Sequence, residues 1–205
     1  MHEDIDWQKI QDLRVASYAR HPTRYSRGVG SLTKTGISLG VFSEEGQAIA
    51  SMRLHATDDP EVPLPYREPA RETCALLGIP RAYVLDRFVA ATDVADVELA
   101  AYAICTALLL VVKQDRSEVP IRWALGLAQK PLARRYTRVY GFKFVSETEW
   151  YLPELSSEKY RVVGNDLRGV LSHKATHPTL REMLLTESHP AVEFYAELRK
   201  KPPLL

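Results

Sequence analysis

Two apolar stretches decide the fold: AYVLDRFV at residues 82–89 and IRWALGL at residues 121–127. Runs rich in β-branched and aromatic side chains favour buried strands. Between them, Asp93 or Asp96 is placed to cap a long helix, which runs to about Lys113 and is apolar on nearly every face. A helical crossover of about thirty residues joins parallel strands. The two stretches are therefore predicted to be adjacent, parallel strands.

The elements on the N-terminal side are predicted from periodicity and turn residues. Apolar side chains recur at helical intervals over residues 7–19, which predicts a helix. Residues 37–42 and 48–55 are predicted to form a hairpin, whose turn includes Gly46, a residue free to adopt a positive φ. A short helix is predicted over residues 68–77 and ends at a glycine.

The elements on the C-terminal side complete the expected architecture. They are a helix from about Pro131 to the residue before Gly141, strands at 142–145 and 160–163, and short amphipathic helices at 179–185 and 191–198. This order predicts an α/β (α+β) fold, a mixed sheet with helices on both faces. We expect one domain over residues 1–150 and a C-terminal helical extension, residues 151–205, packed on it.

Composition and charge exclude several classes of protein. The 205 residues are 45% hydrophobic and 26% charged, with 27 basic and 26 acidic side chains, which excludes disorder and argues against nucleic-acid binding. No apolar leader is visible and the longest uncharged apolar run, 99–112, is too short to span a bilayer, so a cytoplasmic protein without a membrane partner is expected. No metal is expected, because Pro178 disfavours a helix that would align His173 with His177.

Three segments together resemble one family. GQAIASMRL at 46–54 is similar to the G-x-x-x-G-x-x-R-L strand of acyl-homoserine-lactone (autoinducer) synthases and N-acyl amino acid synthases, with Ala50 replacing the second glycine. LDRFV at 85–89 resembles their S-R-F-x-V strand, with Asp86 in place of serine. RYTRVYGF at 135–142 resembles the Y-x-x-x-G-F step of the wider N-acetyltransferase-like (GNAT) superfamily, although Tyr136 lies one place early. The resemblance covers about residues 10–147.

The resemblance implies a GNAT-like fold and an N-acyltransferase. In such a fold two central parallel strands splay apart and an acyl-pantetheine arm inserts between them, while a backbone N–H stabilises the oxyanion that forms when an amine attacks. The splay is expected between residues 87–90 and 123–126. The residues expected to hold the donor there are Phe88, Val89, Ala90, Trp123 and Gly126. The acceptor is the amine of a small molecule or an amino acid.

A different class of function stays open: a GNAT-like binding or sensor module that has lost its cofactor loop, with a cleft plugged by Trp123 or Tyr136.

The expected catalytic residues are Asp86, Arg87 and Tyr136, with Arg53 in substrate binding. In the functional interpretation both arginines orient substrate or pair with Asp86, which acts as the base. The alternatives are arginines on an exposed face of the sheet and a structural ion pair at Asp86.

The donor is expected to be an acyl carrier protein or coenzyme A, with the carrier protein favoured. Residues 90–96 contain no glycine and two aspartates, so they lack the usual phosphate cradle at a helix N-terminus. Residues 130–143 contain no acidic side chain and include Arg134, Arg135 and Arg138. This basic stretch suits docking of an acidic carrier protein, or else is a solvated helix face.

Overall fold

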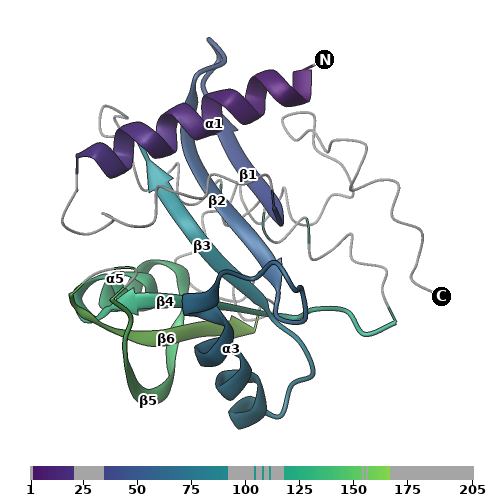
Figure 1. The fold of residues 1–205 in the computed structure, drawn as a ribbon, viewed down its shortest axis with the longest axis vertical. Coiled ribbons are helices and arrows are strands. Elements are labelled where there is room, and N and C mark those ends of the chain that lie inside the picture. The colour runs from purple at the N-terminus through teal and green to yellow at the C-terminus, as the bar shows by residue number, and fades with distance from the viewer. Residues whose placement is uncertain are drawn as a thin grey trace.

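The chain folds around one mixed sheet, shown in the computed structural model of Figure 1. The structure describes residues 2–20, 35–91, 118–153, 155 and 157–166, together with Ile104, Leu108 and Val111. Its elements are α1 (His2–Ala19), β1 (Ile37–Phe42), β2 (Ala48–Ala56), α3 (Leu64–Leu77), β3 (Tyr83–Ala90), β4 (Trp123–Gln129), α5 (Lys130–Tyr140), β5 (Lys143–Tyr151) and β6 (Lys159–Asp166). The six strands lie in the order β1-β2-β3-β4-β6-β5.

The predicted parallel pair is confirmed. β3 and β4 are neighbours and run parallel, with Tyr83 opposite Ala124 and Leu85 opposite Gly126. The other neighbouring strands in the sheet pair antiparallel. The mixed sheet and its helices match the predicted α/β architecture.

The predicted hairpin and the predicted C-terminal ends of two helices are also confirmed. β1 and β2 form the hairpin, and Gly46 in its turn has φ 73°. α3 begins at Leu64, earlier than predicted, and ends at Gly78 in the left-handed conformation. α5 carries Pro131 in its first turn and ends at Gly141, also left-handed. α1 extends further toward the N-terminus than predicted, to His2.

The C-terminal half of the sheet is larger than predicted. β5 continues to Tyr151 instead of ending at residue 145, and most of its side chains are partly or fully exposed. An edge strand of this kind lacks the apolar alternation from which strands are recognised. β6 pairs with both β4 and β5, so the sheet includes residues beyond position 150.

Parts of the prediction lie outside the described residues. These are the helices at 179–185 and 191–198 and both candidate capping residues, Asp93 and Asp96. Within the predicted 93–113 helix, Ile104, Leu108 and Val111 are helical and buried. Their spacing of four and three places them on one helix face, which agrees with a helix packed on the sheet.

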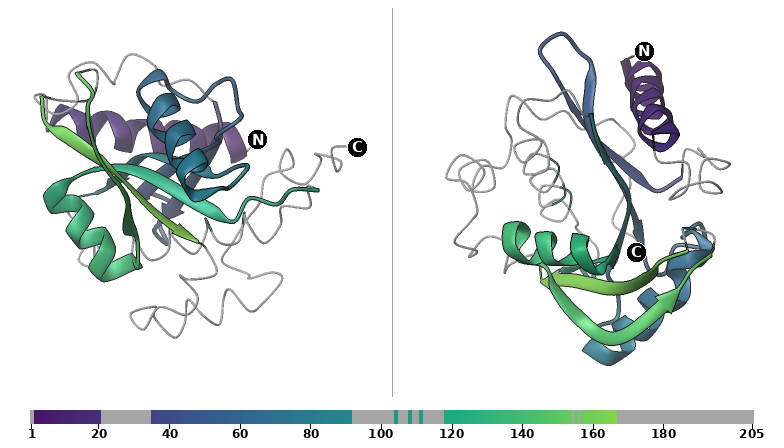
Figure 2. Two further views of the ribbon diagram at one scale, coloured as in Figure 1. Left: turned by 90° about the horizontal axis from the view of Figure 1, so that it is seen from below. Right: turned by 90° about the vertical axis from the view of Figure 1, so that its left-hand side faces the viewer.

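The sheet separates two apolar cores. One contains Met52, Leu54 and Ile104 and includes side chains from α5; the other contains Cys74 of α3 with Val84 and Leu125. The right-hand view of Figure 2 shows α1 and α3 on one side of the sheet and α5 on the other. Among the described residues, no helix has the length and apolar character needed to cross a membrane, and no group of three metal-ligating side chains occurs.

Two glycines on neighbouring strands give a matched test of this packing. A Cβ at Gly164 would lie 2.8 Å from Leu125 Cδ2 and 3.1 Å from Val145 Cγ1, whereas a Cβ at Gly126 meets only Val163 Cγ2, at 3.8 Å, among the described residues. Gly164→Ala is expected to lower the free energy of unfolding by about 1–3 kcal/mol, because the buried neighbours must shift. Gly126→Ala is expected to change it by less than about 0.5 kcal/mol. Urea denaturation measures both, and equal losses would contradict the packing described.

Candidate active site

The central feature of the site is the divergence of β3 from β4. Parallel pairing ends at Leu85 and Gly126, after which residues 86–90 of β3 pair only with β2, and residues 127–129 of β4 only with β6. The β3 side of the predicted splay is therefore correct. The β4 side is wrong, because residues 124–126 are paired and the strands separate beyond them. β3 and β4 separate at their carboxyl ends. Trp123 is the first residue of β4 and pairs with Asp166 of β6, so it lies at the other end of the strand, away from the separation.

A β-bulge in β3 lies at the point of divergence. Ser51 pairs with Val89 and Arg53 with Asp86, so two residues of β3, Arg87 and Phe88, stand opposite one residue of β2. Arg87 has φ 53°, in the left-handed region. A non-glycine residue in this conformation costs about 1–3 kcal/mol and is found preferentially at functional sites. A bulge bends its strand, which accounts for β3 leaving β4 after Leu85.

A buried ion pair adjoins the bulge. Arg53 Nε donates to Asp86 Oδ1 at 2.9 Å and Arg53 Nη2 to Asp86 Oδ2 at 2.5 Å, while Nη1 donates to Thr35 Oγ1 at 3.1 Å. The two side chains of the pair are 2% and 3% exposed. Arg87 Nε lies 3.9 Å from Asp86 Oδ2, and burial lowers the pKa of Arg87. The exposed-face interpretation of Arg53 and Arg87 is therefore wrong, because both side chains are largely buried and α1 packs on β2 and β3 at this face of the sheet.

Arg14 is a member of the site that the sequence analysis missed. It is fully buried on α1, and its Nη2 donates to Ser51 Oγ at 2.9 Å. Burial is the largest cause that lowers the pKa of Arg14, to about 10. A signal was present in the sequence: Arg14 stands midway between Ile10 and Tyr18, at the four-residue spacing of a buried helix face.

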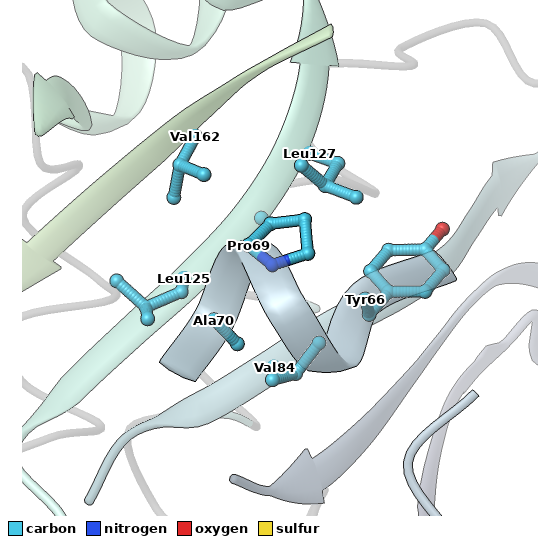
Figure 3. Close-up of a pocket in the computed structure, with 8 residues that line it drawn as sticks. Tyr66, Pro69, Ala70, Val84, Leu125, Leu127 and Val162 are labelled. Carbon is cyan, nitrogen blue, oxygen red and sulfur yellow. The ribbon is translucent and has the colours of Figure 1, made fainter. Parts of the chain in front are cut away.

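An apolar pocket opens beside the divergence on the face of α3 (Figure 3). The pocket is shallow: a volume of about 180 Å³ counts space that is open to solvent, and the enclosed part has room for about one water molecule. It is lined by Tyr66, Pro69 and Ala70 of α3, Val84 of β3, Leu125, Gly126 and Leu127 of β4, and Val162 of β6. The pocket and the buried ion pair lie on the same face of β3, because Val84 lines the pocket and Asp86, two residues further along the strand, binds Arg53.

Phe88 and Tyr136 meet on the opposite face of the sheet. Their rings pack edge to face with centroids 6.5 Å apart, and Tyr136 also contacts Phe142 at 6.4 Å. Val89 is buried and Ala90 packs against the same core as Phe88.

Trp123 and Arg134, two further predicted residues, lie away from this contact. Trp123 packs instead against the core under α3. Arg134 is exposed on α5, the helix that also contains Arg135 and Arg138.

The fold is shared with known acyltransferases. FeeM, an N-acyl amino acid synthase from uncultured soil microbes, superposes with a TM-score of 0.58 and 11% identity, over 80% of this chain and 92% of that chain. BjaI, a coenzyme A-dependent acyl-homoserine lactone synthase, gives 0.57 and 16%, over 91% and 86%. The acyl-homoserine lactone synthase LasI gives 0.56 and 12%, over 91% and 92%. No family model matches the sequence, and no curated protein does.

The buried ion pair generates a stability prediction. Asp86→Asn leaves the Arg53 charge buried without a carboxylate, so the free energy of unfolding is expected to fall by about 3–5 kcal/mol. Replacing both partners, Arg53→Met with Asp86→Leu, removes the unpaired charge and is expected to restore most of that loss. Urea denaturation of Arg53→Met, Asp86→Leu and the double variant completes the cycle. A double variant less stable than Asp86→Asn would show that the pair itself is not the source of the effect.

Proposed function

We propose that the protein is an N-acyltransferase that moves an acyl group from a carrier-protein or coenzyme A thioester to the amine of a small molecule or amino acid. The observation that carries the proposal is the separation of β3 and β4 directly beside an apolar pocket. The separation provides strand-like backbone for an extended donor arm, and the apolar side chains beside it line the surface on which we propose that the acyl chain lies. The fold shared with N-acyltransferases supports the same reaction class.

In the proposal the donor arm lies along the diverging part of β3. Residues 88–90 have no pairing partner on β4, so an extended pantetheine arm takes the position of an added strand. A backbone N–H of this segment donates to the thioester carbonyl oxygen as negative charge develops there. Gly126, the last residue of β4 that pairs with β3, marks the point at which the arm enters.

The reaction is an aminolysis with a simple balance. The neutral amine nitrogen attacks the carbonyl carbon, a C–N bond forms, and the C–S bond breaks with the electron pair leaving on sulfur. The amine loses one proton and the thiolate gains one, so the products are an amide and a free thiol. This proton exchange requires groups within hydrogen-bond reach, directly or through water.

The proposed catalytic residues are Asp86, Arg87 and Tyr136. Both oxygens of Asp86 accept hydrogen bonds from Arg53, which favours a positioning role in which Asp86 holds Arg53 and Arg87 at the bulge. Tyr136 is the proposed proton donor to the leaving thiolate, because its ring contacts Phe88 on the diverging segment of β3.

Shortening the pocket tests the proposed function. Leu127 lines the pocket, is partly buried and lies directly beyond the part of β4 that pairs with β3. Leu127→Trp is expected to lower kcat/KM for donors with acyl chains of eight or more carbons by about tenfold or more, and to leave an acetyl donor nearly unchanged, because only the long chain needs the filled space. Leu132→Trp, at a 41% exposed position on α5, is the matched control.

Three outcomes of this assay are informative. Selective loss with long donors supports the proposed acyl site. Equal activity of Leu127→Trp and wild type with every donor would contradict it. Binding of acyl thioesters without turnover in wild type would instead favour the binding or sensor module, in which the contact between Tyr136 and Phe88 closes the cleft.

The choice of donor is a separate part of the proposal. The lack of glycine at 90–96 favours a carrier protein over coenzyme A. Replacing Arg134, Arg135 and Arg138 by Ala is expected to weaken carrier association about tenfold at low ionic strength and to flatten its salt dependence, because these charges steer an acidic partner. Turnover of a short soluble donor is expected to change little.

The matched control removes arginines from elsewhere on the surface. Arg71 and Arg122 are both exposed and outside this stretch, so changing both to Ala is expected to leave carrier association nearly unchanged. Carrier binding by the triple variant equal to that of wild type at low salt would show that the basic stretch is only a solvated helix face.

A further inference from the structure

α1 directs two long polar side chains, Gln11 and Arg14, into the interior. Gln11 is 6% exposed and Arg14 is 0% exposed. Arg14 Nη2 donates to Ser51 Oγ at 2.9 Å and lies 3.5 Å from Ser38 Oγ. The remaining guanidinium nitrogens, Nε and Nη1, and both polar atoms of the Gln11 amide are buried without a hydrogen-bond partner among the described residues. Buried polar atoms in native proteins nearly always have a partner, so these four atoms point to a missing ligand.

Basic groups also act on Arg14. Beyond the effect of burial, and among the described residues, the charges of Arg53 and Arg87 lower the pKa of Arg14, while Asp86 and Tyr18 raise it. Both oxygens of Asp86 accept hydrogen bonds from Arg53, so this carboxylate is already bound to another guanidinium. A buried guanidinium is costly unless a counter-charge or hydrogen-bond acceptors satisfy it.

We infer that the interior face of α1 forms a carboxylate-binding site, in which Arg14 supplies the charge and the Gln11 amide a second donor. A carboxylate is the anion whose planar pair of oxygens matches a guanidinium, and arginine is used for such recognition in proteins. The site lies on the same face of the sheet as the apolar pocket: Arg14 binds Ser51, Arg53 two residues further along β2 binds Asp86, and Val84 on that face of β3 lines the pocket. The carboxylate comes either from the acceptor substrate or from a free anion. The site goes beyond the proposed function, since binding there requires no acyl transfer.

Calorimetry of the full-length protein without any acyl donor tests the inference. The probes are acetate, L-leucine and leucinamide at constant ionic strength; the last has the leucine side chain and amine but no carboxylate. Arg14→Met is expected to weaken carboxylate binding at least tenfold, and Arg14→Lys, which keeps the charge, to weaken it less. Arg71→Met, which removes an exposed arginine from α3, is the matched control and is expected to bind as wild type does.

Each result supports or overturns the site. Binding of leucine but not acetate, lost in Arg14→Met, assigns the carboxylate to the acceptor; binding of acetate with the same dependence on Arg14 assigns it to a free anion. Equal binding by Arg14→Met and wild type, equal affinity for leucinamide and leucine, or no binding of either carboxylate would overturn the inference.

A second pair of variants serves if circular dichroism shows that Arg14→Met does not fold. Arg14→Lys and Gln11→Met are then compared with wild type, and Gln11→Met is expected to lose affinity at least threefold. A failure of acyl transfer leaves these binding results unaffected, so the two proposals are distinguishable.

Discussion

The ion pair between Arg53 and Asp86 is the interaction on which the site depends. Two charges that are almost fully buried are stable only when both are present and well bonded, and here two of the three guanidinium nitrogens donate to the two carboxylate oxygens. The pair links β2 to β3 in register, one residue before the bulge that contains Arg87. Because β3 carries an extra residue beyond this fixed point, it bends, and its pairing with β4 ends at Leu85.

The alternation of side chains along β3 gives the two faces of the sheet different characters. Val84 and Asp86 face the side of α1 and α3, where one contributes to the apolar core under α3 and the other to the charged cluster. Leu85 and Phe88 belong to the opposite core, where Phe88 contacts Tyr136 of α5. The divergence of β3 and β4 therefore brings together three chemically distinct regions: an apolar pocket, a basic interior and an aromatic contact. An acyl transfer between a chain-bearing donor and a polar acceptor uses regions of these kinds.

The success of the sequence-based predictions varied with the strength of the local pattern. The long apolar strands and the hairpin were recognised because their side chains alternate or form continuous apolar runs, and Gly78 and Gly141 were recognised because a left-handed cap favours glycine. β5 was underestimated because its exposed residues, Glu147 to Glu149, lack apolar alternation. The position of the splay was wrong on β4, since the extent of pairing between two strands depends on their bending, which local patterns do not encode.

The sequence by itself determined the order of the elements and the parallel pairing of β3 with β4, because apolar periodicity and the length of a crossover are local properties of the chain. It also contained the spacing that buries Arg14 between Ile10 and Tyr18 on α1. The tertiary structure alone decided that Arg53 meets Asp86, that Arg14 meets Ser51, and that the strands part after Gly126. These contacts join residues distant in sequence, and each depends on a β-sheet register in which one extra residue changes which side chains face each other.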